Sequence, residues 1–188
     1  MESRKLKEIK KIEGHLLDEE INYLHNSASN INDGCIVEIG NFRGKSTVAL
    51  AKGASDSVDI FTIDPHEKWP KKDPTFGPED RKALLKNLLD YEVLNQVRPI
   101  DLPSEVSSKG WNNLISFLFV DGDHSYRGCK RDFLNWHPHV KPGGIIAFHD
   151  ANKNHTGVPD VINEALEDYP YEITQQTGGI KSLRKINQ

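Results

Sequence analysis

The stretch VEIGNFRGKSTVAL, which runs from Val37 to Leu50, decides how the chain begins to fold. β-Branched residues before Gly40 predict a strand over residues 35–40, and the residues after Gly44 predict a helix over 45–52 that ends at Gly53. Gly40 lets a ligand approach the backbone closely, because it carries no side chain. The stretch therefore predicts a strand, a ligand-binding glycine turn and a helix in direct succession.

The ending Gly-Lys-Ser-Thr suggests the phosphate loop of ATP-binding proteins, but the glycine spacing is wrong for it. A phosphate loop has four residues between its glycines, whereas Gly40 and Gly44 have three between them. The dinucleotide pattern G-x-G-x-x-G fails as well, and what remains is E-x-G-x-x-x-G. In that pattern Glu38 would repel a pyrophosphate and suits a cationic ligand. The spacing argues against ATP and NAD, and it leaves Lys45 as a solvated residue of the first helical turn.

Strand and helix signals alternate along the rest of the chain. Apolar or β-branched runs predict strands at residues 58–64, 97–101, 115–121 and 145–150, and helical periodicity occurs at 15–29, 78–91, 124–140 and 158–169, with a weak signal at 104–114. Residues 141–144 predict a turn, and residues 171–186 predict a terminal hairpin. This alternation predicts an α/β fold in which a mostly parallel sheet has helices on both faces.

The composition limits the class of protein. The 188 residues fit one domain, with residues 1–30 as an N-terminal helical segment that packs on the core and residues 31–188 as the main domain. A net charge of −4 argues against a nucleic-acid partner, and no apolar run is long enough to span a membrane. Cys35 and Cys129 lack metal-ligand spacing, so we interpret them as packing residues of a reduced, cytoplasmic protein.

Acidic residues stand at or near the carboxyl ends of four predicted strands, at Glu38, Asp64, Asp121 and Asp150. In a parallel sheet these ends meet at one edge, where ligands bind. Asp64 follows Gly44 by 20 residues, the usual interval for a carboxylate that receives the ribose hydroxyls of a nucleotide. A ligand with a ribose, no pyrophosphate and a cationic amino-acid end is S-adenosylmethionine.

Four blocks, VEIGNFRGKST, FTIDPH, FLFVDGDHSYRGCKRD and KPGGIIAFHD, resemble the class I S-adenosylmethionine-dependent methyltransferases. With the connecting helices they cover most of Ile31 to Asp150. The last two blocks are similar to the metal-dependent small-molecule O-methyltransferases, especially the macrocin O-methyltransferase-like group. The resemblance implies a Rossmann-like fold with a seven-stranded, mostly parallel sheet and a C-terminal antiparallel hairpin. It also implies O-methylation of a small molecule such as a sugar or phenol, and a cofactor site formed by Glu38, Gly40, Asn41, Gly44, Ser46, Asp64, Pro65, His66, Asp101 and Asp121.

The same resemblance implies a divalent cation bound by Asp121 and Asp150, with Mg²⁺ favoured by oxygen ligands. The chain departs from the family pattern at this point: where relatives have Asp-Asp or Asp-Asn, it has His149-Asp150 or Asp150-Ala151, depending on how the strand end is aligned. Either His149 is a ligand, which would favour a softer ion such as Mn²⁺ or Fe²⁺, or it is a strand histidine that points into the core.

Two residues after Asp121 compete for the role of general base. His124 stands where the catechol-type relatives carry a catalytic lysine, and an imidazole with a pKa near 6.5 suits proton abstraction at neutral pH. Asp123 stands at the base position of the sugar-modifying relatives. Each of the two could instead cap the helix that follows.

The long loop over residues 65–80, which contains Trp69 and Phe76, is interpreted as a lid or an acceptor-recognition element. Two other functions stay open: an enzyme of the same fold with hydroxylase-like chemistry, which His149 beside Asp150 would favour, and a non-catalytic S-adenosylmethionine-binding protein. A homodimer formed through the N-terminal helices is a further expectation from the resemblance.

Overall fold

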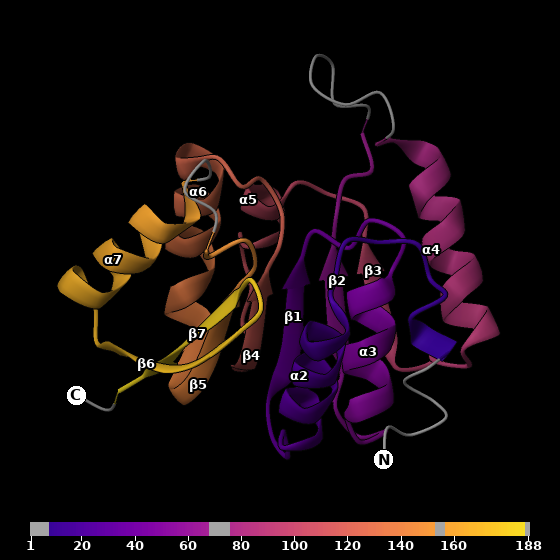
Figure 1. The fold of residues 1–188 in the computed structure, drawn as a ribbon, viewed down its shortest axis with the longest axis horizontal. Coiled ribbons are helices and arrows are strands. Elements are labelled where there is room, and N and C mark those ends of the chain that lie inside the picture. The colour runs from indigo at the N-terminus through magenta and orange to yellow at the C-terminus, as the bar shows by residue number, and fades with distance from the viewer. Residues whose placement is uncertain (1–7, 68–75, 153–156, 187–188) are drawn as a thin grey trace.

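The computed structural model describes residues 8–67, 76–152 and 157–186, which form a seven-stranded sheet with helices around it (Figure 1). Five strands run parallel in the order β3-β2-β1-β4-β5, then β7 pairs antiparallel with β5 and β6 with β7. The strands are β1 (Cys35–Ile39), β2 (Ile60–Ile63), β3 (Val97–Ile100), β4 (Ile115–Val120), β5 (Val140–Phe148), β6 (Tyr171–Thr177) and β7 (Ile180–Lys185). The predicted mostly parallel sheet with a C-terminal antiparallel hairpin is confirmed.

The helices divide between the two faces of the sheet. Apolar side chains of α2, α3 and α4 share one buried cluster, and those of α6 and α7 share the other. The helices are α2 (Asp18–Ser29), α3 (Lys45–Gly53), α4 (Pro78–Asp90), α5 (Ser104–Ser107), α6 (Tyr126–Trp136), the 3₁₀ turn η1 (His137–His139) and α7 (Val158–Asp168). None of the helices in the described ranges has the length and apolar character needed to cross a membrane.

The central strands are buried on both faces, so their side chains alternate between the two clusters. In β4, Phe117 and Phe119 belong to the cluster under α2, α3 and α4, whereas Leu118 belongs to the cluster under α6 and α7. In β1, Ile36 lies on the first side and Val37 on the second. This alternation places Glu38 on the same side as Ile36, beneath α3.

The reversal of strand order falls between β1 and β4, because the chain proceeds from β1 outward to β3 and then returns to β4. At this point the Asp121 N–H donates to the Ile39 carbonyl at 2.8 Å. Ligands of open α/β sheets bind beside such a reversal, at the carboxyl ends of the strands. The fold therefore places its natural binding position next to Gly40 and Asp121.

Three predicted boundaries are wrong in detail. β5 begins at Val140, so residues 141–144 lie within a strand that has an irregular register instead of forming a separate turn. The predicted helix over 124–140 is shorter, because Ser125 caps α6 by accepting the Gly128 N–H and the chain tightens to a 3₁₀ turn after Trp136. The weak helical signal over 104–114 corresponds to one turn only, α5.

The N-terminal segment packs on the sheet through α2, whose Ile21, Leu24 and Ala28 are buried in the first cluster. Figure 1 shows α2 lying beside α3 in front of β1. Cys35 and Cys129 are buried free thiols, as expected for packing residues. Half of the predicted lid over residues 65–80, including Trp69, lies outside the described residues, and its last three residues belong to α4.

Candidate functional site

A cavity of about 770 Å³ opens at the carboxyl ends of the parallel strands, beside the reversal between β1 and β4. Eleven of the residues predicted for the site line it: Gly40, Asn41, Ser46, Asp64, Pro65, His66, Asp121, Asp123, His124, His149 and Asp150. Three residues predicted to bind the cofactor, Glu38, Gly44 and Asp101, are outside this lining.

The two glycines of the opening motif have roles in the backbone. Gly40 has a φ of 82°, and a Cβ atom there would lie 2.3 Å from the carbonyl oxygen of Asp121. Gly44 has a φ of 85° at the start of α3, where a Cβ atom would lie 2.6 Å from the side chain of Leu84. Both positions require glycine because of backbone conformation and the close approach of protein atoms. The prediction had assigned Gly40 to the approach of a ligand.

Asp64 organises the loop that follows β1. Its Oδ2 accepts the backbone N–H groups of Asn41 at 3.1 Å and Phe42 at 3.2 Å, and its Oδ1 accepts that of His66 at 2.9 Å. A carboxylate oxygen accepts two hydrogen bonds, so Oδ1 keeps one position for a ligand hydroxyl.

Asn41 supplies a second indication of a polar ligand. Its side chain is buried and lines the cavity, and neither its Oδ1 nor its Nδ2 has a hydrogen-bond partner among the described residues. A buried amide without partners costs on the order of 1–3 kcal/mol. A polar ligand that bonds to this amide would remove that cost, so this part of the cavity fits a ligand with hydrogen-bonding groups.

Backbone strain is concentrated around the cavity. Among the described residues, four other than glycine have a positive φ, and three of them line the cavity: Phe42 at 46°, His66 at 47° and Asp150 at 57°. Such conformations are uncommon for residues with a Cβ atom and often occur where a site is held in a fixed geometry.

Glu38 is fully buried, and its position differs from the prediction that its carboxylate faces a ligand. Its Oε2 accepts the hydroxyl groups of Thr47 at 2.5 Å and Thr62 at 2.6 Å. Burial raises the pKa of Glu38 to about 7. The glutamate of the E-x-G-x-x-x-G motif therefore joins β1, β2 and α3 beneath the loop.

Replacing Glu38 with glutamine is expected to remove one pH dependence of stability. Because folding raises this pKa from 4.5 to about 7, the protonated carboxyl stabilises the fold fully below about pH 4.5, and that stability is lost as the pH rises through 7. The shift corresponds to on the order of 3 kcal/mol. Urea unfolding of both proteins from about pH 5 to pH 8 measures the difference. A constant difference across this range would contradict the assignment.

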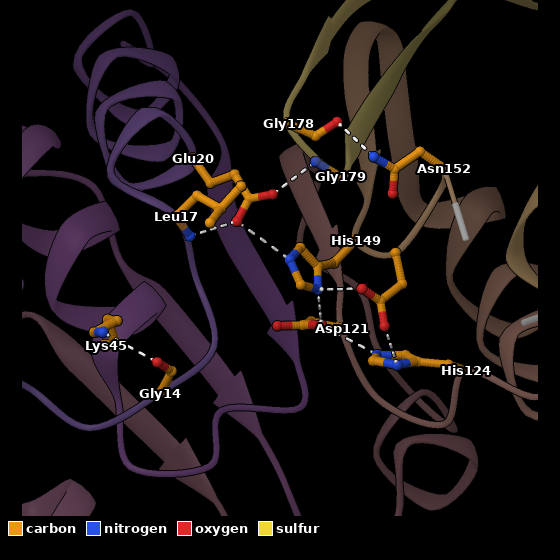
Figure 2. A network of polar contacts seen from close by, with 11 residues as sticks. Gly14, Leu17, Glu20, Lys45, Asp121, His124, His149, Asn152, Gly178 and Gly179 are labelled. Atoms are coloured by element: carbon orange, nitrogen blue, oxygen red, sulfur yellow. Dashed lines mark hydrogen bonds and ion pairs between the residues drawn. The ribbon is translucent and has the colours of Figure 1, made fainter.

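Asp121, His124 and His149 line the cavity and form a charged cluster, whose contacts Figure 2 shows. Asp121 Oδ1 lies 2.9 Å from His149 Nδ1 and 3.2 Å from His124 Nε2. The three side chains can offer ligand atoms that all lie within 4.8 Å of one another, so they could hold one metal ion. His149 therefore lines the cavity. His124 joins the residues that could bind a metal ion, although it was predicted only as a base.

The charges of this cluster stabilise one another. Although burial disfavours its charged form, the charges of Asp121 and Glu20 raise the pKa of His149 to about 10. Burial likewise disfavours an ionised Asp121, but the two histidines hold its pKa below the usual value. Contacts with Asp121 and Asp150 raise the pKa of His124 against the effect of its burial.

The remaining predicted residues of this edge have separate positions. Asp150 Oδ2 lies 2.8 Å from His124 Nδ1, on the ring nitrogen that faces away from Asp121. Asp123 Oδ1 accepts the Ser125 N–H at 2.9 Å, whereas the cap of α6 is Ser125 itself. His124 is therefore part of the charged cluster, and Asp123 lies beside the start of α6.

Asp101 acts on the cavity through other residues. It lies 2.6 Å from Arg81 Nη2 and 3.5 Å from His66 Nδ1. The hydrogen bond from Arg81 lowers the pKa of Asp101. It therefore links α4 to the cavity-lining His66.

Several lining residues were not predicted. Gly14 and His15, which precede α2, line the cavity beside Lys45, whose Nζ donates to the Gly14 carbonyl at 3.1 Å. Lys45 is half-buried, and burial lowers its pKa, so the prediction of a solvated residue is wrong. Asp132 is also buried in the wall, where it accepts the Ser104 hydroxyl and burial raises its pKa to about 6. Its place in the helical sequence gives no signal of this role.

Comparisons with known proteins identify the family of the chain. A family model described as a methyltransferase domain matches residues 37–151. An uncharacterized protein of Acanthamoeba polyphaga mimivirus is 30% identical over 122 residues, which cover 61% of this chain and 50% of that protein. The chain spans no more than half the length of the curated relatives it matches.

Two solved structures share the fold. One is an O-methyltransferase from Bacillus cereus in complex with SAH, with a TM-score of 0.72, 17% identity and coverage of 98% of this chain and 92% of that one. The other is the O-methyltransferase TomG from Streptomyces achromogenes in complex with SAM, with a TM-score of 0.74, 15% identity and coverage of 100% and 92%. At these identities the likeness concerns the fold, which is that of the class I methyltransferases.

Proposed function

The chain belongs to the methyltransferase-domain family, and on that basis we propose that it transfers a methyl group from S-adenosylmethionine to a hydroxyl oxygen of a small molecule. The observation that carries the proposal is one continuous cavity. Its wall joins the polar loop of Asn41 and Asp64 to the charged cluster around Asp121. A nucleoside cofactor and an oxygen-bearing acceptor can therefore occupy the same space.

The loop after β1 is the proposed cofactor side. The open acceptor position on Asp64 Oδ1 suits a ribose hydroxyl, and the Asn41 amide can both donate to and accept from a polar ligand. Ser46 and Lys45, in the first turn of α3, line the same part of the wall. S-Adenosylmethionine, when bound, supplies a methyl group already activated by its sulfonium. The protein must then align the acceptor oxygen with the methyl group and the sulfur, and exclude water from the cavity.

The charged cluster is the proposed acceptor side. A divalent cation held there would bind neighbouring acceptor oxygens and lower the pKa of the hydroxyl. We assign proton acceptance to Asp123, which lines the cavity and uses Oδ1 for the Ser125 N–H, while Oδ2 has no hydrogen-bond partner among the described residues. His124 is less suited, because both of its ring nitrogens contact carboxylates. The fold and a small-molecule acceptor are also consistent with the O-methyltransferases that the chain resembles in structure.

A second candidate function is hydroxylation. Two imidazoles and one carboxylate are the donor set of many non-haem iron oxygenases, and Asp121, His124 and His149 provide that set. The mass of the product distinguishes the two functions, because methyl transfer adds one CH₂ unit and hydroxylation adds one oxygen atom.

Calorimetry with S-adenosylmethionine, ATP and NAD tests the cofactor, and a screen of sugars and phenols with methyl-labelled S-adenosylmethionine tests the reaction. We expect heat of binding for S-adenosylmethionine alone and label on an acceptor oxygen. Binding of ATP or NAD instead would overturn the proposal. Binding of S-adenosylmethionine without label transfer to any acceptor would favour a non-catalytic binding protein.

A further inference from the structure

We propose that Glu20 and Asp150 are positioning residues that present one ring nitrogen each of His149 and His124, beside Asp121, to a first-row transition-metal ion. The inference deepens the proposed function, since it rests on the same cavity and names the class of ion there. It differs from the expectation of Mg²⁺ held by Asp121 and Asp150, because it moves Asp150 from ligand to support and brings in Glu20.

The three donor atoms point to one place. His149 Nδ1 and His124 Nε2 both lie close to the same oxygen, Asp121 Oδ1, at 2.9 and 3.2 Å. Figure 2 shows the two rings approaching Asp121 from different sides. Both histidines and Asp121 line the cavity, so the group is accessible to an ion and to an acceptor.

The other nitrogen of each ring faces a different carboxylate. His149 Nε2 lies 3.4 Å from Glu20 Oε2, and His124 Nδ1 lies 2.8 Å from Asp150 Oδ2. Histidines that bind metals nearly always donate their second N–H to a carboxylate, a carbonyl or water, which fixes the tautomer and the ring plane. Here the second nitrogen of each ring lies close to such a carboxylate, and the first nitrogen of each ring lies beside Asp121. Asp150 Oδ1 also lies 3.5 Å from His149 Nδ1, so Asp150 is close to both rings.

Glu20 is itself bound by two backbone N–H groups (Figure 2). Its Oε2 accepts the Leu17 N–H at 2.7 Å at the start of α2, and its Oε1 accepts the Gly179 N–H at 2.7 Å from the turn between β6 and β7. A Cβ atom at Gly178 would lie 2.7 Å from Glu20 Oε1, so the turn needs glycine to approach the carboxylate. The side chain is 2% exposed. A carboxylate fixed in this way can hold His149 in one orientation.

The donor set decides the class of ion. Mg²⁺ prefers six oxygen ligands and gives up its water reluctantly, whereas imidazole nitrogens suit Fe²⁺, Ni²⁺, Cu²⁺ and Zn²⁺, and affinity rises from Mn²⁺ through Fe²⁺ and Co²⁺ to Cu²⁺. Two imidazoles with one carboxylate leave coordination positions for acceptor oxygens. The site should therefore prefer a first-row transition ion over Mg²⁺.

Cobalt spectroscopy tests the proposal on the whole chain after removal of any histidine tag. Co²⁺ is added to the metal-free protein, and its visible absorption is followed, because nitrogen ligands strengthen and shift the bands of the hydrated ion. We expect a one-to-one spectral change that excess Mg²⁺ does not reverse, and its loss in His149→Ala. Reversal by Mg²⁺, an unchanged spectrum in His149→Ala, or no binding of Co²⁺ by the wild type would each overturn the proposal. In the last case the contacts are structural ion pairs.

Glu20→Gln tests the positioning role, with Glu19→Gln as the matched control, since Glu19 is exposed on the same helix and carries the same charge. We expect Glu20→Gln to weaken Co²⁺ binding about 10- to 100-fold and Glu19→Gln to leave it unchanged. Thermal unfolding is recorded for both, so that a loss of affinity in a folded variant is separated from a loss of folding. Unchanged Co²⁺ affinity in folded Glu20→Gln would overturn this role.

These measurements need neither S-adenosylmethionine nor an acceptor. A protein that binds Co²⁺ as expected but transfers no methyl group would overturn the proposed function and leave this inference standing. A protein that methylates an acceptor but binds Mg²⁺ and Co²⁺ equally would support the proposed function and overturn this inference.

Discussion

Replacement of Asp121 with asparagine is expected to lower the rate of methyl transfer by about 10²- to 10³-fold, the range for removing one preorganised charge from an active site. Asp121 Oδ1 is the atom that both histidines approach, so the amide removes the charge from the centre of the cluster. The variant should also lose stability, because His149 would keep a buried charge without its nearest partner. Breaking a buried pair in this way costs about 3–5 kcal/mol.

Label transfer from methyl-labelled S-adenosylmethionine measures the rate, and urea unfolding measures the stability. Asp160→Asn is the matched control, because Asp160 is exposed in the first turn of α7. A variant with normal activity would contradict the placement of the reaction at this cluster. A variant that loses stability but keeps its rate per folded molecule would assign Asp121 to the fold alone.

Replacement of Asp64 with alanine is expected to weaken S-adenosylmethionine binding by at least about 10²-fold. The change removes the proposed acceptor of a ribose hydroxyl, and it releases three backbone N–H groups that now fix the loop after β1. A hydrogen bond to a charged group contributes about 1.5–3 kcal/mol, so the loss of the single ligand contact on Oδ1, together with the release of the loop, accounts for the expected change.

Calorimetry with S-adenosylmethionine measures the affinity of Asp64→Ala. Asp59→Ala is the matched control, since Asp59 precedes the opposite end of β2 and makes an exposed ion pair with Arg98. An exposed ion pair of this kind contributes little to the stability of the fold. Undiminished affinity in Asp64→Ala would show that the ribose assignment is wrong.

The elements of the fold could be predicted because each carries a local signal. The β-branched runs, the glycine loop and the helical periodicity are all contained within short stretches, and the alternation of strands and helices indicated the parallel sheet. The wrong boundaries arose where tertiary contacts extend or shorten an element. Pairing with β4 makes residues 141–144 part of β5, although Pro142 and two glycines there favour a turn.

Sequence reasoning brought Asp121, Asp150 and His149 to the correct edge, because strand ends in a parallel sheet share one side. It could not predict on which face of the sheet the Glu38 side chain lies. A strand that is buried on both faces lacks the alternation of apolar and polar residues that would indicate this. It also missed Glu20, whose position fits a helix cap as well as any other role. No local spacing relates Glu20 to His149 or Gly179.

One of the hydrogen bonds of Glu20 can form only late in the synthesis of the chain. The Gly179 N–H that binds Glu20 is 159 positions further along the chain, so the ribosome must complete the turn between β6 and β7 before this bond can form. A nascent chain that ends before the hairpin already contains both histidines and Asp121, but only one of the two backbone N–H groups that bind Glu20. In a truncated translation product, Glu20 would therefore keep its contact with the Leu17 N–H and lack the one with the Gly179 N–H until the hairpin is made.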